Sequence, residues 1–199
     1  RDCLAGVVEL TGARPVDEDV FDEALTALVT VMLAEGAAAW RDLVDARWAD
    51  FGATARGFDD AGREISAVDY LKAQQLRAEL CRRVSAVFEQ VDCLILPSMG
   101  LSPGPRALDA GAGLGESNVV LDRAARFTGI WNLTGCPVVS LPCGLSPTGW
   151  PIALQVVAPP HRDALALAVA GRLEERLSLS GAALEPAWAR EEWARSRAT

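Results

Sequence analysis

Apolar residues recur at helical spacing in three long stretches of the chain. The first runs from about residue 18 into the 40s, the second covers 67–91, and the third lies within 163–177. Polar residues that can cap a helix stand at the start of each stretch. They are Asp17 to Asp19, Ser66 with Asp69, and Asp163. The spacing predicts three helices, and the polar, glycine-containing segment 49–63 is expected to be a loop.

Three short apolar runs have the length of buried strands: Leu94–Leu96, Val138–Leu141 and Ile152–Val157. Between the first two lie an irregular stretch rich in glycine, proline and serine (98–117) and a predicted short helix (119–129). Helices that alternate with short strands indicate an α/β fold. We expect α/β/α layers around a central sheet of mixed direction, with the strand order left open.

The chain is long enough for one domain, which we place at residues 1–180, with 181–199 as a polar C-terminal extension. It begins with Arg1 and lacks the pattern of a signal peptide. A start inside a longer protein is the simplest interpretation, and a processed chain would look the same.

The net charge and the apolar pattern bear on whether the chain binds nucleic acids or membranes. The 199 residues carry a net charge of −8, and the charges are mixed along the chain. Nucleic acids and anionic membrane surfaces repel such a chain, so neither is expected as a partner. No continuous apolar run approaches 18 residues, and no membrane-spanning helix is expected.

The cysteines and the single histidine indicate a protein of a reducing compartment that has no metal centre. The five cysteines form no C-x-x-C pair, and their number is odd. They are Cys3, Cys81, Cys93, Cys136 and Cys143. We interpret them as reduced thiols in a cytoplasmic protein. With His161 as the single histidine, a histidine-based metal site is not expected, and no metal or cofactor is expected.

Arg77 is the charged residue that stands out in the second helix. On a helical wheel it falls within the apolar arc of Leu76, Leu80 and Val84, with Tyr70 nearly above it. A guanidinium on such a face needs a carboxylate, a carbonyl or a ligand as partner, because burying it unpaired is costly. Arg77 is therefore either a structural clamp or a substrate-facing residue, and the structural role is the more frequent one.

Residues that could cleave a substrate are scarce in this sequence. One histidine and the absence of G-x-S-x-G give no support to a Ser-His-Asp triad. Lys72 is the only lysine, and it projects away from the apolar face of its helix.

The segment 127–137 combines a predicted turn with two aromatic residues. Gly135 suits a turn into a strand. The aromatic residues Phe127 and Trp131 would line a pocket or fill a core.

Three segments, in this order, resemble the C-terminal half of the amidase-signature hydrolases. The most specific is FTGIWNLTGCPVVSLPCGLSPTGWPIALQVV at 127–157. ISAVDYLKAQQLR at 65–77 resembles a helix of that family, and VDCLILP at 91–97 resembles one of its strands. The resemblance implies an enzyme that hydrolyses a carboxylic amide through an acyl-enzyme, using a Ser–cis-Ser–Lys arrangement.

In that family the catalytic serines and lysine precede the region matched here, so the resemblance implies no catalytic residue within this chain. We expect Arg77 and Tyr70, from their wheel positions, and Phe127 and Trp131, from their place in the family-like segment, to contribute to substrate binding. Expected partners are the upstream half of the same protein and a small-molecule amide, with a homodimer also possible. Residues 1–199 alone are expected to be inactive.

Two other functions remain open. The chain could belong to a non-catalytic remnant or scaffold of the same fold, or to the amide-cleaving subunit of a tRNA-dependent amidotransferase. Those subunits often carry an aspartate where this chain has Ala125. Ala153 and Ala158 also stand where glycine is usual in the family. The upstream lysine and glycine-serine signature would distinguish an enzyme from a remnant.

Overall fold

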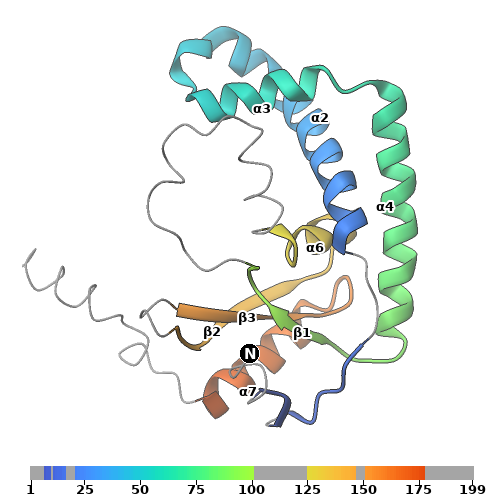
Figure 1. Cartoon of the computed structure of the whole chain (residues 1–199), viewed down its shortest axis with the longest axis vertical. Helices are drawn as coiled ribbons and strands as arrows, with labels where there is room; N and C mark the ends of the chain where they lie inside the picture. The colour runs from blue at the N-terminus through green and yellow to red at the C-terminus, as the bar shows by residue number, and fades with distance from the viewer. Residues whose placement is uncertain (1–6, 10, 17–20, 101–124, 147–150, 178–199) are drawn as a thin grey trace, which may run out of the picture. The chain divides into compact units, whose positions relative to one another are not determined.

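The computed structural model describes residues 7–9, 11–16, 21–100, 125–146 and 151–177 (Figure 1). The chain forms two compact units. The helical unit comprises Glu18–Val87 and Gly104–Gly135, and the sheet unit comprises Arg1–Asp17, Phe88–Pro103 and Cys136–Thr199. The predicted extension at 181–199 lies outside the described residues and stays a prediction.

The helical unit contains the two longest helices of the described chain. Its described elements are α2 (Phe21–Arg47), a 3-10 turn at Trp48–Asp50, α3 (Ala53–Arg63), α4 (Ala67–Phe88) and α6 (Gly129–Thr134). α2 packs against both α3 and α6. The helices predicted from about 18 into the 40s and over 67–91 are both present among the described residues, and the second ends at Phe88, three residues before its predicted end.

Antiparallel α2 and α4 are linked by polar side chains. Tyr70 of α4 contacts Glu35 of α2, and Arg83, further along α4, contacts Glu23, near the start of α2. The reversed order of these contacts requires the two helices to run in opposite directions. The residues of α4 that are buried lie at helical spacing, as the wheel predicts: Ala73, Leu80, Val84 and Val87.

The segment expected to be a loop at 49–63 is instead mostly helical, so that prediction is wrong. α3 presents a narrow buried face whose members are Asp59 and Gly62, three residues apart. A Cβ atom on Gly62 would lie only 2.2 Å from the carbonyl oxygen of Leu33 in α2. Glycine thus permits close contact between the helices. The polar composition concealed this helix because so little of its surface is apolar and buried.

The described residues of the sheet unit form three strands and one long helix. These are β1 (Leu94–Pro97), β2 (Val138–Leu145), β3 (Pro151–Val157) and α7 (Asp163–Leu177). The strand order is β1-β3-β2, and both pairings are antiparallel. Strands are present at all three predicted apolar runs, and β2 continues four residues past its expected end at Leu141. The helix predicted after Asp163 is confirmed.

Alternate side chains of β2 face the core of this unit. Leu141 and Cys143 are buried, and they cluster with Leu154 and Val156 of the central strand β3. α7 packs on β2 and β3 and adds further apolar side chains to this core. A bulge between Pro142 and Gly144 interrupts the register, since proline cannot donate to the ladder.

The two units together give the α/β class that the sequence predicts. Of the short helix predicted at 119–129, the described part shows Ala125 in helical conformation and a turn at 126–128, and a separate helix, α6, begins at Gly129. Residues 119–124 of the prediction lie outside the described residues. Gly135 follows α6 with φ of +73°, a left-handed conformation that glycine adopts readily. The expected turn before β2 is therefore present.

Candidate functional site

The four residues predicted to contact substrate all belong to the helical unit. Tyr70 and Arg77 lie seven residues apart on α4, and Phe127 and Trp131 lie just before and within α6. The structure joins Arg77 to α6 and joins Tyr70 to α2. The four residues thus form two groups within one compact unit.

Tyr70 belongs to a hydrogen-bond network between α4 and α2. Its hydroxyl donates to Oε1 of Glu35 at 2.8 Å. Nε2 of Gln74, one turn along α4, donates to the Tyr70 hydroxyl oxygen at 2.8 Å and lies 3.3 Å from the same Glu35 oxygen. This network fixes the direction of the phenol group, so its oxygen stands at a defined place.

Arg77 has one of the partners that its place on the helical wheel requires, a backbone carbonyl group. Its Nε donates to the backbone oxygen of Leu133 at 2.7 Å, and the side chain is half-buried. Leu133 lies in the last turn of α6, where carbonyl groups lack helical partners. The prediction that Arg77 is half-buried and paired is confirmed, and the pairing is the structural one. A contact between Arg77 and a substrate stays a prediction.

The two aromatic residues near α6 differ in exposure. Trp131 is 3% exposed and fills the core of the helical unit, whereas Phe127 is half-buried. α6 itself lies close to α2, because a Cβ on Gly129 would meet the side chain of Leu28 at 2.7 Å. Phe127 therefore offers more surface to a ligand than Trp131 does.

Tyr70 also lines a hollow of about 510 Å³ on the helical unit. Polar groups around it include Glu35, Ser66 and two arginines, Arg41 and Arg63. Arg63 bonds to both Asp45 and Asp59, and these hydrogen bonds raise the pKa of its guanidinium. The hollow presents both donors and acceptors, which suits a polar ligand.

Comparison with protein families gives a match that includes all four predicted site residues. A family model described as Amidase matches residues 15–167.

The chain belongs to the amidase family.

The chain resembles curated proteins over part of their length. A protein of Mycobacterium tuberculosis that bears the amidase name AmiD is 33% identical over 123 residues, which are 62% of this chain and 26% of that protein. A fatty acid amide hydrolase of Arabidopsis thaliana is 36% identical over 114 residues, 57% of this chain and 19% of that protein. The chain spans about a quarter or less of the length of these relatives.

The fold is also that of a solved amidase. Its crystal structure superposes with a TM-score of 0.71, at 24% identity, over 88% of this chain and 41% of that one. The likeness confirms the fold class. It also agrees with the resemblance that the sequence segments indicate.

Gln155 is a buried polar residue that was not predicted as a site residue. It is 0% exposed on the central strand β3, and its Nε2 donates to the carbonyl oxygen of Pro97 at 3.0 Å. In the register it stands between Leu96 of β1 and Ser140 of β2. A lone glutamine within the apolar run 152–157 is the sequence signal that marks it.

Asp59 is a second buried polar residue without a sequence prediction, because its helix was expected to be a loop. It is 7% exposed and lies on the face of α3 that meets α2. The sequence signal for it is the spacing of Asp59 and Arg63, a carboxylate and a cation one helical turn apart.

The described cysteines are free thiols. Cys136 and Cys143 are buried, and Cys81 and Cys93 are half-buried. Burial raises the pKa of the Cys93 thiol, and the negative charge of Asp92 adds to the effect. Within the described part of the chain, no three His, Cys, Asp or Glu side chains group so as to hold a metal ion. The absence of a metal centre from the protein stays a prediction.

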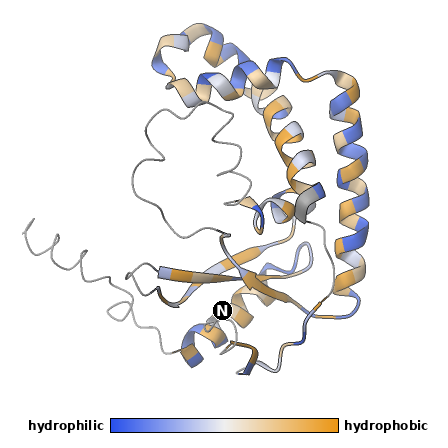
Figure 2. Ribbon diagram, in the orientation of Figure 1, coloured by the Kyte–Doolittle hydropathy of each residue, from blue (hydrophilic) through white to orange (hydrophobic). Residues whose placement is uncertain are grey.

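The helix that spans Glu23–Asp50 is more apolar than the sequence pattern suggested. It contains an 18-residue window with a mean hydropathy of 1.3, which by length and composition alone is enough to cross a membrane. Figure 2 shows apolar residues along much of α2. A core helix of a soluble protein passes the same test, and α2 packs against α3 and α6. The prediction that no helix crosses a membrane stays a prediction.

Proposed function

We propose that this chain is the C-terminal part of an enzyme that hydrolyses a carboxylic amide. The observation that carries the proposal is the match of the amidase family model to residues 15–167. Because the chain spans about a quarter or less of its curated relatives, the reacting groups are assigned to the part of the protein upstream of residue 1.

The proposed reaction proceeds through an acyl-enzyme. A serine hydroxyl attacks the amide carbonyl carbon, while a bridging serine and a lysine accept its proton. The tetrahedral intermediate collapses, the C–N bond breaks, and the amine leaves with a proton. Water then attacks the ester, which releases the carboxylic acid and restores the serine. All three catalytic side chains are assigned to the upstream half.

The helical unit is proposed to form part of the substrate pocket. Tyr70 offers a phenol oxygen beside a polar hollow, and Phe127 offers a half-buried aromatic surface. Arg77 and Trp131 act mainly by holding α6 in place, since one bonds its last turn and the other is buried within it. Linear amides and a cytoplasmic location are part of this proposal.

The test is complementation of the two halves. Purified residues 1–199 are expected to release neither ammonia nor amine from any amide in a panel of linear and aryl amides. Co-expression with the upstream half is expected to restore hydrolysis, and a serine-to-alanine change in the upstream signature to abolish it. Hydrolysis by residues 1–199 alone would contradict the assignment of the chemistry.

The same experiment separates the alternatives. A complex of both halves that folds cooperatively and cleaves nothing in the panel supports a remnant or scaffold. Glutamine cleavage that depends on further subunits and on acyl-tRNA supports an amidotransferase subunit. Size-exclusion chromatography of the complex measures whether it contains one copy of each half or forms the homodimer that the sequence analysis leaves possible.

A further inference from the structure

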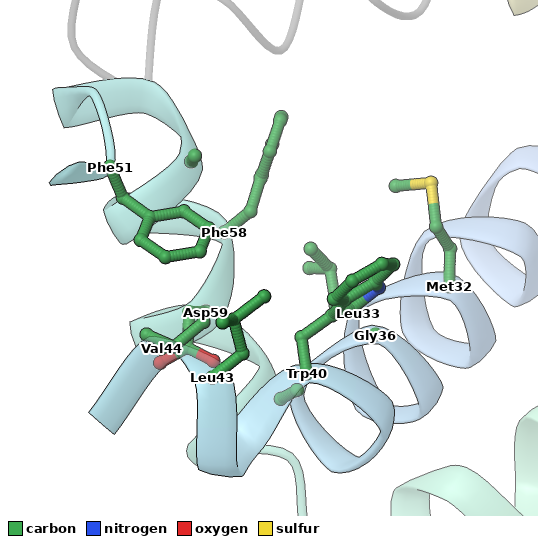
Figure 3. Close-up of a pocket in the computed structure, with 11 residues that line it drawn as sticks. Met32, Leu33, Gly36, Trp40, Leu43, Val44, Phe51, Phe58 and Asp59 are labelled. Atoms are coloured by element: carbon green, nitrogen blue, oxygen red, sulfur yellow. The ribbon is translucent and has the colours of Figure 1, made fainter. Parts of the chain in front are cut away.

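A second hollow lies between α2 and α3, within the helical unit. It has a volume of about 290 Å³. Its walls are mainly apolar, with Trp40 from α2 and Phe58 from α3 on facing sides and Phe51 from the connection between them (Figure 3). A cavity of this size holds one aromatic ring with a short chain rather than a long substrate.

One charged side chain contributes to this apolar lining. Asp59 is 7% exposed and reaches from α3 towards α2, beside Val44 (Figure 3). Its Oδ2 accepts a hydrogen bond from Nε of Arg63 at 2.6 Å. Its Oδ1 is buried and, among the residues that the structure describes, receives no hydrogen bond. A buried carboxylate oxygen without a donor is costly, so this atom calls for a donor from a ligand.

The charges around Asp59 specify the kind of donor. Arg63 is shared, because its guanidinium also bonds Asp45, with 2.5 Å between the Nη2 and Oδ1 atoms. Two carboxylates therefore face one cation, and the cluster keeps a net negative charge. A ligand that brings a positive N–H donor completes the balance, whereas an anion is repelled and a hydrocarbon leaves Oδ1 unsatisfied.

We propose that this hollow is a binding site for a small organic amine with an apolar body. The ammonium group donates to Oδ1 of Asp59, and the apolar part lies among Trp40, Phe51 and Phe58. Aromatic faces favour a nearby cation as well as an apolar group, so the walls suit both ends of such a ligand. The proposal concerns binding only, so its test does not depend on the proposed amide hydrolysis.

The experiment measures ligand binding to the intact protein by isothermal titration calorimetry. The probes are 2-phenylethylamine, its neutral counterpart 2-phenylethanol and the anion 3-phenylpropanoate. We expect the amine to bind at least about tenfold more tightly than the alcohol, and the anion to bind most weakly. Equal affinity for amine and alcohol, or no detectable binding of the amine, overturns the proposal.

Two variants locate the binding. Asp59→Asn keeps the shape of the side chain, and we expect it to weaken amine binding about tenfold or more while alcohol binding changes less than about twofold. Asp45→Asn is the matched control, because it also removes a carboxylate from Arg63 but does not line the hollow. Amine affinity that falls equally in both variants overturns the assignment to Oδ1 of Asp59.

Ala55→Leu supplies an independent test that leaves Asp59 unchanged. Ala55 lines the hollow on the exposed side of α3, so a leucine there fills the space without entering the core. We expect it to weaken both the amine and the alcohol by about tenfold or more, with an unchanged melting temperature. If the Ala55→Leu protein binds both probes as the wild type does, the ligands lie elsewhere and the proposal is overturned. This outcome does not depend on whether the Asp59→Asn protein folds.

Discussion

The guanidinium Nε of Arg77 lies 2.7 Å from the carbonyl oxygen of Leu133 and donates a hydrogen bond to it. This contact joins α4 to α6 across 56 residues of sequence. A charged donor is well suited to the last turn of a helix, where the carbonyl groups carry partial negative charge. Arg77 therefore holds the segment that contains Trp131.

We predict that Arg77→Ala lowers the free energy of unfolding by about 1.5–3 kcal/mol, the range for a hydrogen bond to a charged group. Urea denaturation of the intact protein measures the change. Arg82→Ala is the matched control: Arg82 is 73% exposed and pairs with Glu79 on the same helix. That variant is expected to change stability by less than about 0.5 kcal/mol.

Steady-state kinetics separates the structural role of Arg77 from a substrate contact. A structural role predicts an unchanged KM for the folded fraction of Arg77→Ala. A raised KM at wild-type stability would instead show that the guanidinium binds substrate, and would contradict the prediction of lowered stability.

Two helical glycines should respond to alanine with opposite sign. Gly62→Ala places a Cβ 2.2 Å from the Leu33 carbonyl oxygen, a backbone atom that cannot move without separating α3 from α2. We expect a loss of about 1–3 kcal/mol. Gly36 has open space around its Cβ position, so Gly36→Ala should raise stability by about 0.5–1 kcal/mol. Thermal or urea unfolding of both variants checks the pair, and destabilisation by Gly36→Ala would contradict this packing.

Much of the fold could be predicted because the spacing of apolar residues along a long segment indicates a helix without knowledge of distant contacts. The pattern of α4 and the cap formed by Ser66, whose Oγ accepts the Asp69 amide at 3.1 Å, are local in sequence. The strands were marked by apolar runs. α3 was missed because its contact with α2 depends on glycine and on a buried carboxylate rather than on apolar side chains.

The candidate site was predicted less completely for a related reason. The wheel position of Arg77 required a partner, but nothing local could identify Leu133, which lies far away in sequence. Tyr70 was placed beside Arg77 by the wheel, yet its hydroxyl bonds Glu35 of α2. Partners that come from other elements are set by packing, and one sequence does not contain that packing explicitly.

Phe127 is predicted to select among substrates more strongly than Trp131 does. Phe127 is half-buried and offers surface, while Trp131 is 3% exposed and supports the core. We expect Phe127→Ala to change the preference among amides of increasing acyl length by about tenfold or more in kcat/KM. Trp131→Phe should instead lower stability with little change in preference.

The measurement is kcat/KM over a homologous amide series in the intact protein. Leu167→Ala is the control, since Leu167 is 62% exposed on α7 in the sheet unit. An unchanged acyl-length profile in both the Phe127 and Trp131 variants would reject a role for either residue in the substrate pocket.

Cys93 is predicted to make the sheet unit lose stability at alkaline pH. Burial raises the pKa of its thiol in the folded state, and Asp92 adds to the shift. The unfolded chain releases this proton first, near the ordinary thiol pKa of about 8.5. Stability should therefore be constant with respect to this group below about pH 8.5, and fall as pH rises towards the higher folded pKa.

Cys93→Ala removes the titrating group, so its stability should fall less steeply between about pH 8.5 and pH 10 than that of the wild type. Val139→Ala is the control, because Val139 packs against the same core as Cys93 and does not titrate. It should lower stability equally at every pH in this range. Urea denaturation at several pH values provides the comparison, and parallel profiles for Cys93→Ala and wild type would show that the thiol is not protected by burial.

Because the raised pKa also keeps the thiol protonated, Cys93 should react with iodoacetamide at pH 8 more slowly in the folded protein than in urea.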